Sequence, residues 1–318
     1  MTSADAMAEP GWPDPAALRD ALARADAQLE LASPVLQHLL TARDHSLFSD
    51  SIVARVRGML VNLAGQFLRV QAEATGERAS EQFSERHREA LADRFFASSS
   101  LVAYCHATAL EWQLGLDLES RLGVDPALSP LIQDTVGHED AEVASAAMAV
   151  LAAQTRFVRQ GRRMELPLSE LDGDLFHEAL RIWREYPEND LSDALTRAES
   201  RMRADFDEGE GRLALLARLI TLLRPQSIDT LNIQTAGVAV FLSALAIRTG
   251  QSRTRAVRST NIGQLVRLAL GLRAAGLKAG DVDTQLLLIH PDMARPTELD
   301  DLGTREAADW LAAAGARA

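Results

Sequence analysis

The chain has 318 residues, of which 47% are hydrophobic and 5% are aromatic, and its formal net charge is −12. This length suffices for one large body or two smaller domains with a sizeable buried core. The negative charge disfavours, for the surface as a whole, binding to nucleic acids and to anionic membranes. Because Cys105 is the only cysteine, no disulfide can form within the chain.

The first 13 residues lack the basic and apolar regions of a signal peptide. We expect residues 1–13 to form a disordered tail. The sequence holds no uninterrupted apolar run of about 18 residues, so no membrane-spanning segment is expected. These features predict a cytoplasmic protein that does not bind membranes.

Helix-start signals and apolar residues at helical spacing recur along the first half of the chain. Asp14-Pro15 and Ser33-Pro34 each predict the beginning of a helix. The segment 101–122 is apolar on most faces, which is typical of a central helix. Further helices are expected at 50–75, 80–96, 129–136 and 140–157.

The segment 163–174 is polar, contains Pro167 and Gly173, and interrupts the helical periodicity. We interpret it as a linker between an N-terminal helical domain at 14–162 and a C-terminal helical domain at 175–318. The overall prediction is an all-α, multi-helix array with antiparallel helix pairs. Helices of the second half are expected at 174–183, 191–206, 213–223, 235–249, 252–259, 262–275, 281–289 and from Thr304 onward.

Two proline-started segments resemble each other, Ser33-Pro34-Val35-Leu36-Gln37 and Ser129-Pro130-Leu131-Ile132-Gln133. They indicate either a repeated helix pair or chance similarity between Ala/Leu-rich helices. The second segment, with the acidic turn at 138–142 and the apolar run to Leu151, resembles a HEAT-type unit. The runs at 238–250 and 272–277 are similar to a bacterial all-helical family of the domain of unknown function 2336 type. The resemblance implies a HEAT-like helical fold and no activity, and it brings no functional residues.

The segment 230–280 contains no Asp or Glu but seven basic residues, in a chain whose net charge is −12. Such asymmetry indicates an anion-facing surface, or a basic face that packs against the acidic remainder or is merely solvated. The basic residues of this segment are Arg248, Arg253, Arg255, Arg258, Arg267, Arg273 and Lys278.

Within this basic segment, 245–258 resembles a helix-turn-helix unit. Ala246 would allow close packing of the two helices, and Gly250 would form the turn between them. Phosphate contacts would come from Arg253, Arg255 and Arg258. Base contacts would come from Gln251, Ser252 or Thr254. The candidate anion or nucleic-acid contacts are therefore Arg248, Gln251, Arg253, Arg255, Arg258 and Arg267.

Catalytic and metal-binding patterns are weak by comparison. Cys105 and His106 place a thiol next to an imidazole, but neighbours on a helix point about 100° apart, so core packing is favoured over a nucleophilic role. The sequence has no His-Glu-x-x-His, no Cys-x-x-Cys and no glycine-rich phosphate loop. We therefore expect no metal, no cofactor and no catalytic residues that the sequence identifies.

The leading hypothesis is a non-enzymatic helical scaffold or regulatory adaptor that binds another macromolecule, with a protein as the expected partner. One alternative is a DNA-binding regulator that contacts nucleic acid through 245–273. A second alternative is an enzyme whose site is assembled from distant helices, which helical bundles can achieve without a sequence motif.

Overall fold

The computed structural model describes residues 15–41, 50–75, 80–186, 193–223, 228–292 and 302–315. The tail predicted at 1–13 lies outside these residues. Every regular element in the described ranges is a helix, so the predicted all-α, multi-helix array is confirmed. Across the same ranges, no helix is long and apolar enough to cross a membrane.

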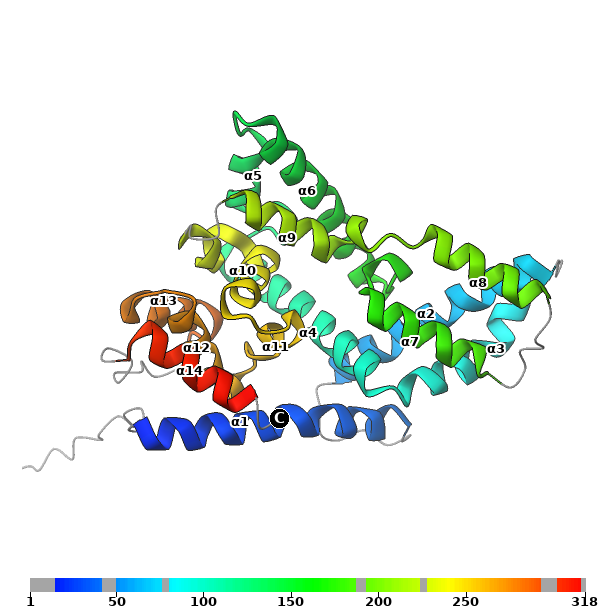
Figure 1. Cartoon of the computed structure of the whole chain (residues 1–318), viewed down its shortest axis with the longest axis horizontal. Helices are drawn as coiled ribbons and strands as arrows, with labels where there is room; N and C mark the ends of the chain where they lie inside the picture. Colours follow the sequence, from blue (N-terminus) through cyan, green and yellow to red (C-terminus); the bar gives the residue numbers. More distant parts are fainter. Residues whose placement is uncertain are drawn as a thin grey trace, which may run out of the picture.

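One group of helices packs around α2 and forms what we call the α2 core (Figure 1). The buried stripe Val56, Leu60, Leu63 and Phe67 faces the centre of this core, as the helical period predicts. Phe67 packs against Trp183 with ring centroids 5.8 Å apart. The elements of the α2 core are α2 (Asp50–Thr75), α3 (Ser80–Phe96), η1 (Leu168–Glu170), α7 (Gly173–Arg184) and α8 (Asp193–Asp205).

A second group surrounds α10, which is buried along most of its length, and forms the α10 core. Its apolar sequence on all faces explains this central position. The elements of the α10 core are α5 (Pro130–Val136), α6 (Ala141–Arg162), α9 (Arg212–Leu222), η3 (Ile228–Leu231), α10 (Ile233–Thr249), α11 (Arg253–Arg258), α12 (Leu265–Ala274), α13 (Ala279–Ile289) and α14 (Thr304–Gly315). The short helix η2 (Glu208–Glu210) precedes α9, and η4 (Ile262–Gln264) precedes α12.

Two long helices connect the cores. Helix α4 (Ser99–Leu122) contributes Leu101 and Val102 to the α2 core and Leu114 and Leu118 to the α10 core. This shared position agrees with its apolar sequence. Helix α1 (Pro15–Thr41) runs along one side of the molecule (Figure 1) and contacts α4, α12 and α14, as well as α2 and α3 of the α2 core.

The helix start predicted at Ser33-Pro34 is wrong, because α1 continues through Pro34 without a break. Leu22 is buried in the α10 core and Leu36 in the α2 core, so packing on both sides holds the two halves of α1 in one helix. A proline in a helix costs about 3 kcal/mol, which this burial offsets. By contrast, Ser129-Pro130 does begin a helix, and Ser129 caps α5. The two proline-started segments therefore have different structures.

The predicted linker at 163–174 is an integral part of the packing. Leu166 and Leu171 are buried in the α2 core. Helices α5 and α6, which precede this segment, pack in the α10 core, whereas α7 and α8, which follow it, pack in the α2 core. Each core thus draws helices from both sides of 163–174.

Candidate functional site

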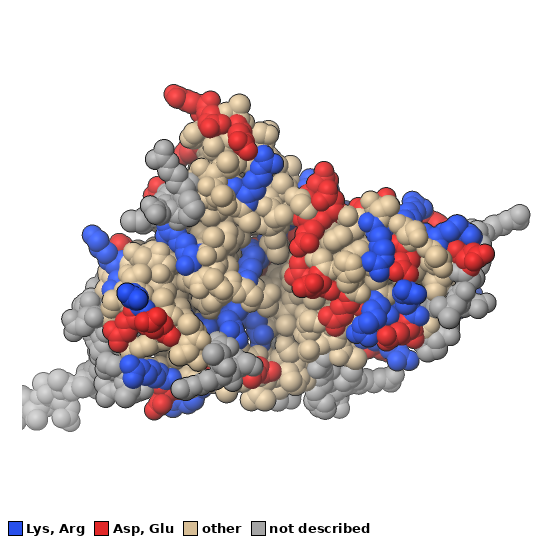
Figure 2. Space-filling view, in the orientation of Figure 1, with Lys and Arg blue, Asp and Glu red and all other residues tan. Residues whose placement is uncertain are grey.

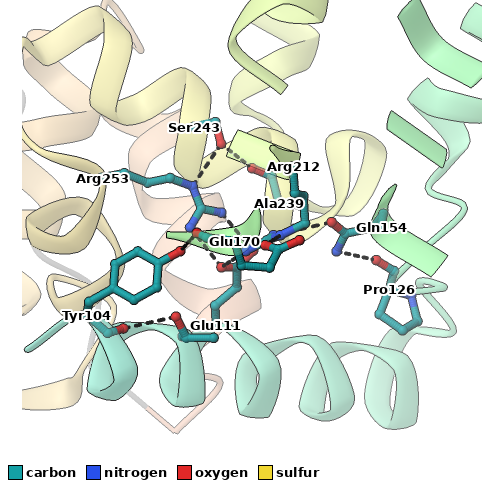
Figure 3. Close-up of polar contacts among 10 residues, drawn as sticks. Tyr104, Glu111, Pro126, Gln154, Glu170, Arg212, Ala239, Ser243 and Arg253 are labelled. Carbon is teal, nitrogen blue, oxygen red and sulfur yellow. Dashed lines mark hydrogen bonds and ion pairs between the residues drawn. The ribbon is translucent and has the colours of Figure 1, made fainter. Parts of the chain in front are cut away.

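A buried cluster of charged side chains lies where the two cores meet, and we call it the Glu111 network (Figure 3). It consists of Glu111 on α4, Glu170 in η1, Arg212 at the beginning of α9 and Arg253 at the beginning of α11. The side chains of Glu111 and Arg212 are 2% and 1% exposed, and that of Arg253 is 17% exposed. Four helical elements far apart in sequence therefore contribute to one charged cluster.

Both arginines bind Glu111 with two hydrogen bonds each. Arg212 donates from Nη1 and Nη2 at 2.8 and 3.2 Å, and Arg253 donates from Nη1 and Nη2 at 2.8 and 2.7 Å. Arg212 Nε also donates to Glu170 at 3.0 Å. Two carboxylates thus face two guanidinium groups, and the network is close to neutral. Such forked pairs are the strong form of a charge-assisted hydrogen bond.

Neutral side chains complete the network. Arg253 Nε donates to Ser243 Oγ at 3.0 Å, and Arg212 Nη1 donates to Gln154 Oε1 at 3.3 Å. The Tyr104 hydroxyl donates to the carbonyl oxygen of Glu170. Figure 3 shows Ser243 beside Arg253, Gln154 beside Arg212 and the Tyr104 hydroxyl beside Glu170. The buried charges therefore have most of their hydrogen bonds satisfied within the protein.

Local backbone features place the two arginines. Gly211 precedes Arg212, and a Cβ on this glycine would lie 3.0 Å from the carbonyl oxygen of Ser169. The glycine therefore lets α9 begin close to η1, where Glu170 lies. Before Arg253, Gly250 adopts a left-handed conformation with φ of 65° and reverses the chain. The turn predicted at Gly250 is present.

The electrostatics of the network favour permanent ionisation. Burial alone would raise the pKa of Glu111, but Arg212 and Arg253 outweigh it and hold this pKa well below its usual range. Burial would lower the pKa of Arg212, but Glu111 and Glu170 raise it above the ordinary value. A carboxylate that stays charged at neutral pH is not a proton donor.

The network has no room for a substrate. The void beside Glu111, Gln154 and Phe157 has a volume of about 10 Å³. That is the space of about one water molecule at most. Ion pairs that hold a fold together perturb pKa values as strongly as catalytic groups do. The Glu111 network is therefore a structural connection between the cores.

The predicted contact residues of 245–258 divide between the interior of the fold and one cavity. Arg253 is committed to Glu111, and Ala256 and Val257 are buried beside α4. Arg258 donates to the carbonyl oxygen of Leu29 on α1. Arg255 is half-buried and lines a cavity at the first turn of α4, together with Ser252, Thr254 and Arg258.

The other predicted residues also bind within the fold. Arg248 donates to the carbonyl oxygen of Ala275 at 3.1 Å. Arg267 is buried, pairs with Asp26 on α1 and donates to Gln251 Oε1 at 3.1 Å. The basic segment was expected to face an anion, to pack against acidic residues or to be solvated. Arg253 and Arg267 follow the second of these, because each pairs with a carboxylate of the fold.

Sequence reasoning did not identify Glu111 or Arg212. A signal was available, because Glu111 lies between Leu110 and Trp112 in a helix that is apolar on most faces. A carboxylate in such a position is rarely buried without a cationic partner. The identity of that partner could not be read from the sequence, since Arg212 and Arg253 are 101 and 142 residues away.

Cys105 and His106 do not form a catalytic pair. Cys105 is fully buried in the α2 core, and burial raises the pKa of its thiol. His106 instead lines a cavity between α1 and α4. Among the residues that the structure describes, no three His, Cys, Asp or Glu side chains gather closely enough to hold a metal ion.

Comparisons of the chain with protein-family models, with curated proteins and with solved structures give no match.

Proposed function

We propose that this protein is a non-enzymatic helical adaptor that binds a partner protein through the outer face of α6. The observation that carries the proposal is Met148, which is 53% exposed although the rest of the large apolar side chains of α6 are at least partly buried. Ser145 and Ala152 are exposed on the same face, at helical spacing. Small residues around one flexible apolar side chain suit the close approach of a partner helix.

The position of α6 supports this assignment. Its opposite side, with Val143, Val150 and Phe157, packs into the molecule against α5 and α9. The α5–α6 pair projects from the body in Figure 1. Ser129 caps α5 and Asp140 caps α6, as in the HEAT-type unit that the sequence resembles. In stacked helix pairs of that kind, a pair at the edge leaves one face uncovered.

Charge gives the partner a stated chemistry. Glu139 and Asp140 are exposed at the beginning of α6, and acidic atoms gather at this end of the molecule in Figure 2. We therefore expect the partner helix to carry an apolar residue opposite Met148 and basic residues toward the α5–α6 turn.

The adaptor hypothesis fits the geometry better than its alternatives do. Arg253, the first residue of the supposed recognition helix, is bound to Glu111, and the helix packs on α4. The buried carboxylate that could have served an enzyme is enclosed without substrate space. Both features lie away from the exposed face of α6, which stays available for a partner protein.

The test begins with capture of partner proteins from the source lysate on the immobilised full chain. A captured protein is then purified, and its affinity is measured for the wild type, for Met148→Glu and for Ile247→Glu. Ile247 is 44% exposed on α10 and serves as the matched control. We expect Met148→Glu to weaken binding at least about tenfold, as for a central apolar anchor, and Ile247→Glu to leave it unchanged. Equal affinity of all three proteins would contradict the proposal, as would the absence of any partner with a dissociation constant below about 10 μM.

A further inference from the structure

A cavity of about 720 Å³ lies between α1 and α4 and is also lined by the segment 260–264 and the end of α13. We call it the α1–α4 cavity. Pockets that bind small organic molecules have volumes of roughly 300–1,000 Å³. The α1–α4 cavity does not involve the outer face of α6, so its role is independent of the adaptor function.

Most of the cavity wall is apolar. Leu110 and Leu114 come from α4, Leu29 from α1 and Ile289 from α13. At the rim, Leu31 and Ile262 are 62% and 68% exposed, the highest values among the large apolar side chains of the described residues. Exposed apolar residues around an apolar hollow indicate a site that is covered when it is occupied.

Three polar side chains of the wall each have a buried atom without a hydrogen-bond partner. These atoms are His106 Nδ1, Arg258 Nε and Gln264 Oε1. His106 and Gln264 are only 7% and 3% exposed. An unpaired buried polar atom costs about 1–3 kcal/mol, and native proteins hold few of them.

Other bonds hold two of these side chains in place. Arg258 donates from Nη2 to the carbonyl oxygen of Leu29, and Gln264 donates from Nε2 to the carbonyl oxygen of Ala25 at 2.8 Å. Both acceptors belong to α1. The polar part of the wall is therefore fixed before any ligand enters, which lowers the cost of binding.

The charge of the wall favours an anion. Burial first, and Arg255 second, lower the pKa of Arg258, and among the described residues this guanidinium forms no ion pair with a carboxylate. Burial and then Arg258 lower the pKa of His106 to about 4, so this imidazole is neutral at pH 7. Asp117 is the one acidic residue that lines the cavity, and its side chain is exposed.

We propose that the α1–α4 cavity binds a small amphipathic molecule that carries a carboxylate on an apolar body. The carboxylate lies beside the guanidinium group of Arg258 and the neutral imidazole of His106, the two side chains of the wall that can donate hydrogen bonds to an anion and lack a full set of partners. The apolar body lies on the leucine and isoleucine side chains and covers Leu31 and Ile262 at the rim.

The experiment uses the full chain and three probes with the same apolar chain, namely decanoate, 1-decanol and decylamine, all below their aggregation limits. Binding is measured by isothermal titration calorimetry and by the shift in melting temperature. We expect saturable 1:1 binding of decanoate, at least about tenfold weaker binding of decanol because the charged hydrogen bond is lost, and no binding of decylamine. Equal affinity for decanoate and decanol would overturn the assignment of the carboxylate.

Variants locate the site. Arg258→Gln should weaken the binding of decanoate at least about tenfold and leave the binding of decanol unchanged. Ala32→Trp fills the cavity from α1 without removing a polar group, and it should abolish binding of both probes. Ala23→Trp, on the same helix but outside the cavity, is the matched control and should bind like the wild type. Circular dichroism confirms that each variant is folded. Unchanged binding by Ala32→Trp, or loss of binding in Ala23→Trp, would refute the proposed site.

Discussion

Arg253 donates two hydrogen bonds to the carboxylate of Glu111, from 142 residues away in the sequence. This contact fixes α11 on α4, and Arg212 fixes α9 on the same carboxylate. Glu111 is thus the point where the beginnings of two helices from the second half of the chain bind the central helix (Figure 3).

We expect Glu111→Gln to destabilise the protein by about 3–5 kcal/mol, because it leaves two guanidinium groups near a neutral amide, one of them fully buried. Equilibrium unfolding in urea gives the free energy of unfolding. Glu142→Gln is the matched control, since Glu142 pairs with Arg218 on the surface and both side chains are more than 60% exposed. Its cost should stay below about 1 kcal/mol. A similar, small cost for both variants would show that the Glu111 network does not stabilise the fold.

The same contact leads to a prediction about nucleic acid. Arg253 binds Glu111, and Arg258 donates to the carbonyl oxygen of Leu29, so two of the three predicted phosphate contacts are used within the fold. We expect no salt-dependent binding of labelled duplex DNA in fluorescence anisotropy at low ionic strength, where phosphate contacts are strongest. Salt-dependent binding that is lost when Arg253, Arg255 and Arg258 are replaced by Ala would instead support the DNA-binding alternative.

His106 predicts a pH dependence of stability. The pKa of this side chain falls from 6.5 to about 4 on folding, so the unfolded chain binds the proton more tightly. The contribution of neutral His106 to the free energy of unfolding is complete above pH 6.5. It is lost as the pH falls toward 4, and the loss reaches up to about 3 kcal/mol. Glu111, whose pKa is lowered in the fold, adds its own loss only below about pH 4.3.

Urea unfolding between pH 7 and pH 4.5 measures this effect. His106→Asn should reduce the slope of the free energy of unfolding against pH, whereas His138→Asn, at an exposed position, should leave the slope as in the wild type. If His106→Asn keeps the full slope, the buried imidazole is not its cause.

Local signals predicted much of the fold. Asp140 caps α6, Gly250 ends α10 in a left-handed conformation, and α3 spans the predicted residues 80–96. These features depend on neighbours a few residues away, which the sequence displays directly.

The candidate sites depend on contacts between distant segments, and these could not be predicted from the sequence. The basic segment showed an excess of arginines, but not that Arg253 would meet Glu111 or that Arg267 would meet Asp26. The continuity of α1 could not be predicted for the same reason. Leu22 and Leu36 are buried in different cores, and this packing keeps α1 helical through the start signal at Ser33-Pro34.

Gly237 offers a test of how α10 positions the projecting α5–α6 pair. Its φ of 72° and ψ of 164° interrupt α10, and a Cβ at this position would lie 2.7 Å from the Cβ of Ser129, which caps α5. Gly237→Ala therefore combines backbone strain with a steric clash, and we expect a loss of about 3 kcal/mol in the free energy of unfolding.

Gly280→Ala is the matched control, because this glycine lies in the first turn of α13 and a Cβ there would have no heavy atom within 4 Å. Alanine should be neutral or stabilising by less than about 1 kcal/mol at that position. Displacement of Ser129 should also alter the orientation of α5 and α6. Gly237→Ala should therefore weaken the binding of an identified partner protein more than it weakens the binding of decanoate. Unchanged stability of Gly237→Ala would mean that Ser129 and α10 separate at little cost, and that the α5–α6 pair is not held by this contact.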